Sequence, residues 1–157
     1  GLMCEALLRT NQYISSESIE TISNAMDVGN PSNMKRIMDI YSNVENLKND
    51  LSAFSFDDEK TKKCIKDVWS TYNYMLDPHS AVGLLGLDEF LKINSDFEGI
   101  FLGTAHPAKF SDIIEPIISK KIDMPTNLTK VINKEKNAIL LNNDYNVFSD
   151  YLLTNFK

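Results

Sequence analysis

The sequence lacks the glycine-rich patterns that usually bind phosphate, and it has few residues of the types that bind metals. Neither GxGxxG nor GxxxxGK[ST] occurs, so no Rossmann-type or P-loop phosphate site is expected. There are only two cysteines, Cys4 and Cys64, and they show no CxxC spacing. We therefore predict no zinc motif, and we expect two reduced thiols in a cytoplasmic protein rather than a disulfide.

Positive charge and long apolar runs are also scarce. Lys and Arg number 16 against 22 Asp and Glu, which gives a net charge of −6, and the basic residues are spread along the chain. This distribution argues against nucleic-acid and anionic-membrane partners. No apolar run approaches the roughly 20 residues of a membrane span. The 43% of apolar residues nevertheless suffices for a sizeable core.

Most of the chain shows apolar residues at helical spacing. The pattern predicts helices over residues 2–8, 31–49, 57–73, 80–91, 107–118, 126–133 and 146–156. Ser80 is a suitable N-cap for the fourth of these. Pro116 predicts a kink or a restart in the fifth. Gly83 and Gly86 lie inside a predicted helix and suggest close packing against another backbone.

Short stretches of alternating or β-branched residues predict a few strands. They cover residues 18–23, 73–76 and 98–102. The fold class expected from helices and strands together is α/β and helix-rich, with the strands belonging to a larger, mainly parallel sheet.

Three polar turns, each directly before a predicted helix, combine Asn, Asp, Ser, Thr or His with Gly or Pro. They cover residues 24–33, 77–80 and 104–109. One interpretation is that they line a single cleft, since open α/β sheets bind ligands where strands end. The other is that each is only a turn and a helix cap, which use the same residue types. For any single turn taken alone, the second interpretation is favoured.

Individual side chains in these turns suggest further functions. Thr104 follows the predicted strand 98–102 and offers a hydroxyl that can pair with a neutral nitrogen. His79 and His106 are the only histidines, and together with Asp77 they raise the possibility of a metal site. Their spacing matches no metal-ligand pattern, so a metal site is the weaker interpretation.

The three turns, in this order, resemble threonine synthase of the long, microbial and fungal type. The segments that carry the resemblance are SNAMDVGNPSN (23–33), DPHSAVG (77–83) and LGTAHPAKF (102–110). The resemblance runs from about residue 21 to residue 128, and the last predicted helix also fits the tail of the family.

The resemblance implies an enzyme that uses pyridoxal 5'-phosphate and has the tryptophan-synthase β fold, called fold type II, of which this chain is part of the large domain. The family converts O-phospho-L-homoserine and water into L-threonine and phosphate, a step of threonine biosynthesis catalysed by a lyase. Thr104 falls on the position that hydrogen-bonds the pyridine nitrogen of the cofactor. Further implied contacts are Asp77, His79 and Ser80 in a turn that faces the cofactor ring, His106 nearby, and Asn24, Asp27, Asn30 and Asn33 in a substrate-cleft loop.

Two features of the family are missing from this sequence. The lysine that forms the Schiff base lies before an Asp-Phe-Gly segment in the family, and no such segment exists here. The loop that binds the cofactor phosphate is absent too. Residues 1–157 are therefore expected to form only a C-terminal segment, with a poorly matched start (1–20), a best-matched part (21–128) and a helical tail (129–157). We expect no catalytic residue in this segment, and Lys109 is interpreted as a structural lysine.

An isolated segment of this kind is expected to be inactive and not to bind the cofactor by itself. Its expected partners are the missing N-terminal part of the same enzyme and the small-molecule substrate. An alternative is a non-catalytic homologue or a regulatory module that keeps the scaffold without the chemistry. A small helical interaction domain is a third possibility, and it predicts that the three turns lie far apart.

Overall fold

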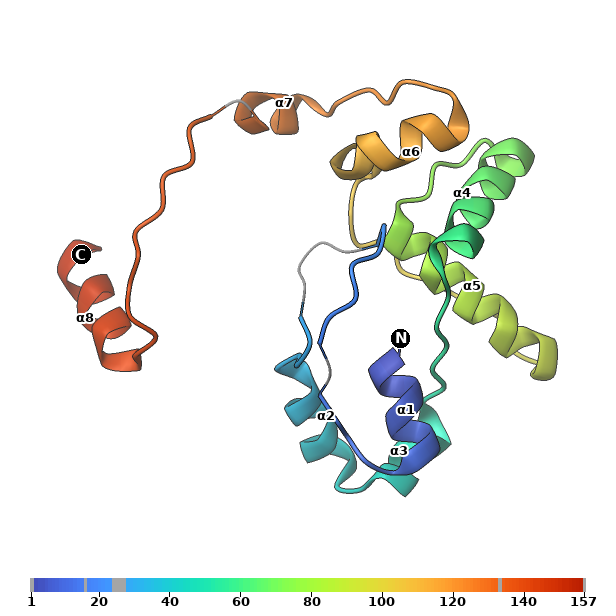
Figure 1. Cartoon of the computed structure of the whole chain (residues 1–157), viewed down its shortest axis with the longest axis horizontal. Coiled ribbons are helices and arrows are strands. Elements are labelled where there is room, and N and C mark those ends of the chain that lie inside the picture. The colour runs from blue at the N-terminus through green and yellow to red at the C-terminus, as the bar shows by residue number, and fades with distance from the viewer. Residues whose placement is uncertain (1, 16, 24–27, 133, 157) are drawn as a thin grey trace. The chain divides into compact units, whose positions relative to one another are not determined.

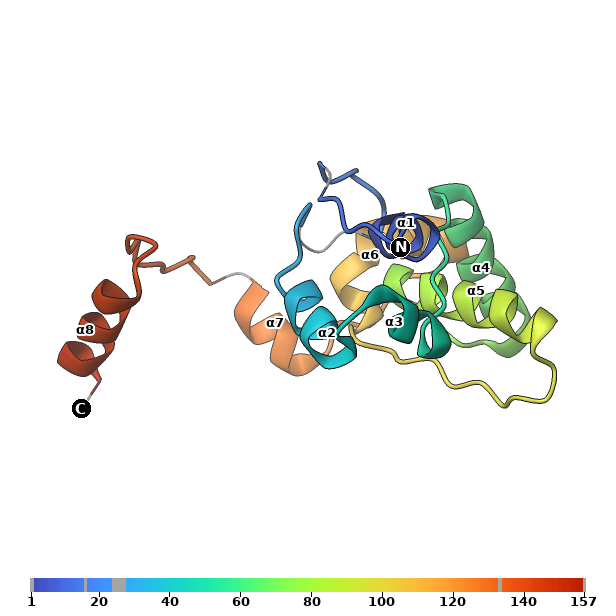
Figure 2. The same ribbon diagram turned by 90° about the horizontal axis from the view of Figure 1, so that it is seen from below.

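The chain folds into helices joined by long irregular segments. The computed structural model describes residues 2–15, 17–23, 28–132 and 134–156. Two compact units divide the chain after Asp123. The first contains α1 (Leu2–Thr10), α2 (Asn33–Tyr41), α3 (Val44–Asp50), α4 (Asp58–Tyr72), α5 (Pro78–Ile93), a 3-10 turn η1 (Pro107–Phe110) and α6 (Ser111–Ile118), and the second contains α7 (Thr126–Ile132) and α8 (Tyr145–Asn155) (Figures 1 and 2). Among these described residues, no helix is long and apolar enough to cross a membrane.

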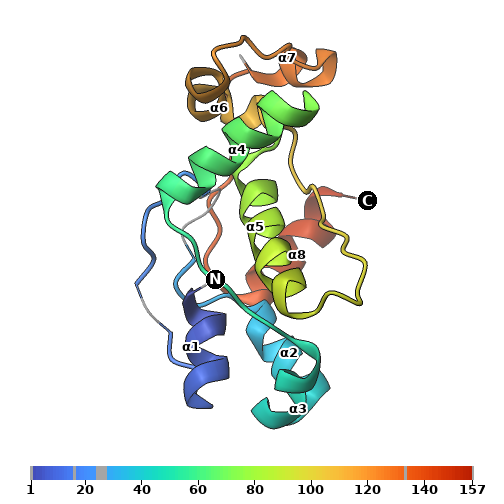
Figure 3. The ribbon, with the colours of Figure 1, turned by 90° about the vertical axis from the view of Figure 1, so that its right-hand side faces the viewer.

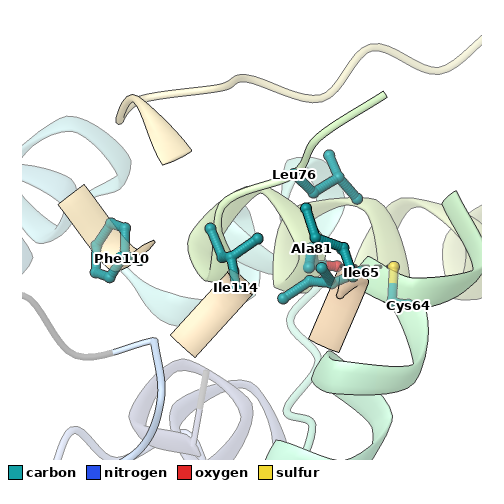
Figure 4. Close-up of a cluster of buried hydrophobic side chains, with 7 residues drawn as sticks. Cys64, Ile65, Leu76, Ala81, Phe110 and Ile114 are labelled. Atoms are coloured by element: carbon teal, nitrogen blue, oxygen red, sulfur yellow. Dashed lines mark hydrogen bonds between the residues drawn. The ribbon is translucent and has the colours of Figure 1, made fainter. Parts of the chain in front are cut away.

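The main core of the first unit lies where α4 packs against α5 and α6 (Figure 3). Thr61, Cys64, Ile65 and Val68 recur at intervals of three and four residues, so α4 presents one continuous face. Ile65, Ala81 and Ile114, one from each helix, are completely buried. Figure 4 shows these three side chains converging with Cys64, Leu76 and Phe110. This cluster fixes the starts of α5 and η1, where two of the polar turns lie.

A second, smaller cluster joins the first three helices. Leu7 of α1, Met34 of α2 and Leu47 of α3 are buried against one another. The helix predicted over residues 31–49 is wrong as a single element, because it is divided into α2 and α3. Ser42 ends α2 in the left-handed conformation, and the side chain of Asn43 caps α3 by accepting a hydrogen bond from the Asn46 amide. Local hydrogen bonds from a Ser-Asn pair therefore override the helical periodicity.

The start of α5 also differs from the prediction. The helix begins at Pro78, and Asp77 rather than Ser80 is its N-cap. Proline is well tolerated as a first helical residue because its missing N–H has no helical acceptor there. The close backbone packing predicted at the two glycines of α5 is not found among the described residues. Within them, a Cβ on Gly83 would meet nothing within 4 Å, and one on Gly86 would meet the rings of Phe54 and Phe56.

Of the kink or restart predicted at Pro116, the restart is wrong. α6 continues through Pro116 to Ile118, and the break lies earlier, between η1 and α6. A proline removes one helical hydrogen bond but does not force the helix to end at that residue. Here the helix ends at Ser119, which adopts the left-handed conformation.

The last two predicted helices correspond to α7 and α8. For α7, residue 133 lies outside the described part of the chain. α8 is capped by Asp144 instead of Asn146, because the Asp144 carboxylate accepts hydrogen bonds from the amides of Asn146 and Val147.

No strand forms among the described residues. The predicted strands 18–23, 73–76 and 98–102 are irregular or extended instead. The amide of Ile22 donates to the Asp58 carboxylate at 3.2 Å, which ties the first of these stretches to the start of α4. Ile100 and Leu102 have 87% and 78% of their surface exposed. An extended segment forms a strand only where a neighbouring strand pairs with its backbone, and the described residues supply none here. The α/β expectation is therefore confirmed only in its helix-rich part.

Glu115 makes the chain after α6 sensitive to acid. One carboxylate oxygen accepts a hydrogen bond from the Lys121 ammonium at 2.7 Å, and the other accepts one from the Ile122 amide at 3.0 Å. These two contacts, the lysine first, hold the pKa of Glu115 below its usual value of 4.5. A lowered folded-state pKa contributes stability that is present above the unfolded pKa and is lost as the pH falls through the folded pKa.

We therefore expect Glu115→Gln to make stability less dependent on pH below about 4.5. The unfolding midpoint of wild type and variant, measured by circular dichroism between neutral and acidic pH, checks this. Lys121→Gln removes the larger of the two causes and is expected to give an intermediate pH dependence. An acid dependence that is the same in wild type and Glu115→Gln would contradict the assignment.

Candidate functional site

The turn before α5 is organised by the buried carboxylate of Asp77. One of its oxygens, Oδ1, accepts hydrogen bonds from the amide of His79 at 2.9 Å and from the amide of Ser80 at 3.4 Å. The same oxygen lies 3.2 Å from Nδ1 of His79. The other oxygen, Oδ2, accepts a hydrogen bond from the Ser80 hydroxyl. With 2% of its surface exposed and hydrogen bonds to both of its oxygens, the Asp77 carboxylate holds this turn together.

The turn before η1 uses the same device with a different residue. His106 is the N-cap of η1, and its Nδ1 accepts a hydrogen bond from the amide of Ala108 at 3.1 Å. Pro107 follows it directly, as Pro78 follows Asp77. A cap side chain followed by proline thus starts both helical segments. Both turns thus contain a helix cap.

These two turns come together in space. The rings of His79 and Phe110 lie 5.2 Å apart and are tilted by 58°. A Cβ placed on Gly103 would lie 3.6 Å from the Ser80 hydroxyl, so the backbone of the second turn approaches the first closely. The possibility that all three turns lie far apart is therefore wrong for this pair.

Thr104 lies between two anchored residues. Phe101 and Ala105 pack against the core of α4, α5 and α6, whereas Leu102, Gly103 and Thr104 are exposed. The exposed Thr104 hydroxyl forms no hydrogen bond with another residue in the part of the chain that the structure describes. The segment therefore holds an unengaged hydroxyl beside the Asp77 turn.

The third turn, residues 24–33, makes its described contacts with other parts of the chain. Asn24 and Asp27 lie outside the described residues. Asn30 accepts a hydrogen bond from the Tyr13 hydroxyl at 2.8 Å, and Asn33 is the first residue of α2, next to the cluster of α1, α2 and α3. The structure thus brings together Asp77, His79 and Ser80 with the turn of Thr104, and it gives Asn30 a local partner instead.

Other reactive groups do not add to this site. Cys4 and Cys64 are free thiols, and burial raises the pKa of Cys64 to about 11. The Cys64 thiol donates weakly to the carbonyl of Ala81 at 3.8 Å, so it belongs to the core. Among the described residues, no three His, Cys, Asp or Glu side chains are grouped to bind a metal.

Sequence reasoning missed a pocket of about 510 Å³ beside α5. It is lined by residues 50–54, by Cys4, and by the α5 face that carries Gly83 and Gly86. The two glycines were the signal that pointed to it. Because glycine has no side chain, Gly83 and Gly86 leave a hollow at this surface. The sequence had instead predicted that another backbone packs there.

We expect Asp77→Ala to destabilise the fold more than the loss of an ordinary helix cap. It leaves two amides and the buried Ser80 hydroxyl without their acceptor, at a cost of about 2 kcal/mol or more. Asp57→Ala removes the exposed cap of α4, which accepts from the Lys60 amide at 2.8 Å, and is the matched control. It should cost about 1 kcal/mol. Urea unfolding of both variants checks the order, and equal losses would contradict the role given to burial.

The sequence matches a family model described as threonine synthase, C-terminal, over residues 80–152. Threonine synthase of Buchnera aphidicola subsp. Schizaphis graminum is 33% identical over 146 residues, which cover 93% of this chain and 33% of that protein. Threonine synthase of Escherichia coli strain K12 is 32% identical over 123 residues, covering 78% of this chain and 28% of that protein. The chain therefore spans about a third of the length of these relatives.

Solved structures agree with the sequence comparison. The crystal structure of threonine synthase from Escherichia coli superposes with a TM-score of 0.75 at 28% identity, and the match covers 97% of this chain and 35% of that one. A threonine synthase from Brucella melitensis with bound PLP superposes with a TM-score of 0.62 at 21% identity, over 96% of this chain and 37% of that one. The second likeness concerns the fold alone.

Proposed function

Because this chain belongs to the threonine synthase family, in which it corresponds to the C-terminal part, we propose that it completes a pyridoxal-phosphate lyase. The whole protein would convert O-phospho-L-homoserine and water into L-threonine and phosphate. The observation that carries the proposal is the unengaged Thr104 hydroxyl beside the turn of Asp77.

The residues present suit one end of the cofactor. Thr104 offers a hydroxyl that can pair with the pyridine nitrogen without bringing a negative charge to it, unlike a carboxylate. The tilted pair of His79 and Phe110 supplies ring surface near the same turn. His106 and Ser80 stand next to it, each already engaged through one atom. When bound, the cofactor supplies the electron sink that the reaction needs.

The remainder of the cofactor site would come from chain that is not present in this sequence. No phosphate-binding loop and no Asp-Phe-Gly segment with a preceding lysine occur here. Ile100 and Leu102 are two residues apart and would lie on one face of a strand, while Phe101 between them packs against the core. Their exposed side chains suit a strand whose second face is covered within a larger parallel sheet. The substrate-cleft role of Asn24, Asp27, Asn30 and Asn33 stays part of this proposal.

The test compares a full-length protein that contains this chain with the 157-residue chain alone. Phosphate release from O-phospho-L-homoserine in the presence of pyridoxal phosphate is measured for both. We expect turnover by the full-length protein and none by the chain alone, which should also show no Schiff-base absorbance from a specific lysine. A full-length protein that lacks turnover would favour the alternative of a non-catalytic homologue.

A further inference from the structure

We propose that His79 is the general base that takes a proton from the water consumed in the reaction, and that Asp77 is the positioning residue that fixes the required imidazole tautomer. This inference rests on the proposed function, because it assigns a step of that same reaction, and it departs from the sequence-based expectation that this segment holds no catalytic residue. It is carried by the hydrogen bonds around the two histidines, which set them in opposite tautomers.

The contacts of Asp77 determine which nitrogen of His79 carries the proton. Its Oδ1 already accepts hydrogen bonds from the amides of His79 and Ser80, so it acts as an acceptor. Nδ1 of His79 lies 3.2 Å from that oxygen and must therefore donate to it. In a neutral imidazole with the proton on Nδ1, the other nitrogen, Nε2, has a free lone pair and accepts protons.

His106 is set the other way round. Its Nδ1 accepts a hydrogen bond from the Ala108 amide at 3.1 Å, and an amide can only donate. The neutral ring therefore carries its proton on Nε2, where it is a donor. Of the two histidines, His79 is the one whose Nε2 is an acceptor, and no donor to this nitrogen is found among the described residues.

The surroundings of His79 suit a base. Its side chain is 34% exposed, while Asp77 is 2% exposed, so the imidazole is accessible and its carboxylate partner is not. The Ser80 hydroxyl is already engaged with Asp77. Ser80 in turn approaches Gly103, the residue before Thr104, so His79 stands beside the turn proposed for the cofactor. A base oriented by a buried carboxylate is the arrangement that activates hydroxyl groups and water in many enzymes.

Phosphate leaves from the neighbouring carbon before water adds. A lone pair on the water oxygen then forms the bond to the substrate carbon that becomes the hydroxyl-bearing carbon of threonine, and the π electron pair given up at that carbon would pass into the electron sink that the bound cofactor supplies. One O–H bond breaks, its electron pair stays on the oxygen, and its proton passes to Nε2 of His79. The resulting imidazolium is stabilised by the Asp77 carboxylate and later returns its proton to solvent. His79 thereby contacts a reacting atom, while Asp77 acts through His79.

The first test measures the tautomers directly. Nitrogen-15 NMR of the 157-residue chain, labelled at histidine, distinguishes Nδ1–H from Nε2–H, and only two imidazoles contribute signals. We expect Nδ1–H for His79 and Nε2–H for His106 at a pH where both are neutral. Asp77→Ala is expected to change the His79 signals and to leave those of His106 unchanged. An Nε2–H tautomer at His79 would overturn the proposal.

The second test is kinetic and uses the full-length protein. His79→Asn keeps an amide donor near the position of Nδ1 and removes Nε2, so it separates the base from the contact with Asp77. We expect kcat to fall about 10²- to 10⁴-fold, with KM changed only a few-fold. Lys92→Gln, at an exposed lysine near the end of α5, is the control and should keep the wild-type kcat.

A wild-type kcat in His79→Asn would overturn the proposal. The tautomer measurement needs no variant at His79, so an Nε2–H tautomer overturns the proposal even if that substitution prevents folding. Different results would refute the proposed function and the role of His79. A wild-type full-length protein that releases no phosphate refutes the proposed function, whereas an active wild type with an unaffected His79→Asn refutes only the role of His79.

Discussion

A full-length protein with Thr104→Val is expected to release phosphate from O-phospho-L-homoserine with a strongly reduced kcat/KM. Valine keeps the shape of threonine but removes the hydroxyl that we assign to the pyridine nitrogen. Losing one such hydrogen bond costs about 1–3 kcal/mol, equivalent to a roughly 5- to 150-fold lower rate constant. Thr104 is exposed in this chain, so the same substitution should leave the unfolding midpoint of the 157-residue chain almost unchanged.

Thr104→Ser is the matched control for this prediction. It keeps the hydroxyl and loses only a methyl group, so we expect most of the activity to remain. The absorbance of bound cofactor should shift in the valine variant and not in the serine variant, since only valine alters the contact with the ring nitrogen. Equal activities for valine and serine would contradict the role given to Thr104.

The second large effect concerns the core of α4, α5 and α6. Ile65→Ala removes a completely buried side chain that packs beside Ala81 and Ile114 (Figure 4). Truncations of this kind cost about 2–5 kcal/mol, because the lost contacts are only partly recovered by collapse around the cavity. Since whole domains are stable by only about 5–15 kcal/mol, a large part of the stability should be lost.

Ile93→Ala is the control for the core substitution. It makes the same chemical change near the end of α5, where the side chain is 81% exposed. It should alter stability by no more than about 0.5 kcal/mol. Urea unfolding of both variants, followed by circular dichroism, measures the difference. Comparable losses at the two positions would show that α4 does not form the core of the unit.

The helices were largely predictable because their signals are local. The buried residues of α4 recur at intervals of three and four, and acidic residues in its first turn indicate where the helix starts. The division between α2 and α3 was missed, since periodicity averages over several turns while the break depends on two residues, Ser42 and Asn43. The cap of α5 was misplaced by three positions for a similar reason: Asp77 and Ser80 are both good cap residues, and only the hydrogen bonds select Asp77.

The predictions of strands and of backbone packing at the glycines failed for a different reason. Strands depend on partners that need not be near in sequence, and the described residues contain no partner for the segment around Ile100. A glycine shows only that no side chain is present, and the space beside Gly83 is a hollow instead of a backbone contact. Neither the absence of a strand partner nor the hollow can be deduced from residues nearby in the sequence.

The sequence by itself determined the helical framework, the identity of the polar turns and, through their motifs, the family of the chain. Only the tertiary structure decided that the turns of Asp77 and Thr104 lie together, that Asn30 pairs with Tyr13, and that His79 and His106 have opposite hydrogen-bonding roles. The physical reason is that turn and cap chemistry is local and can be read along the chain. Which turns become neighbours, and which atom of a side chain stays free, depends on the packing of α4, α5 and α6, which joins residues far apart in sequence.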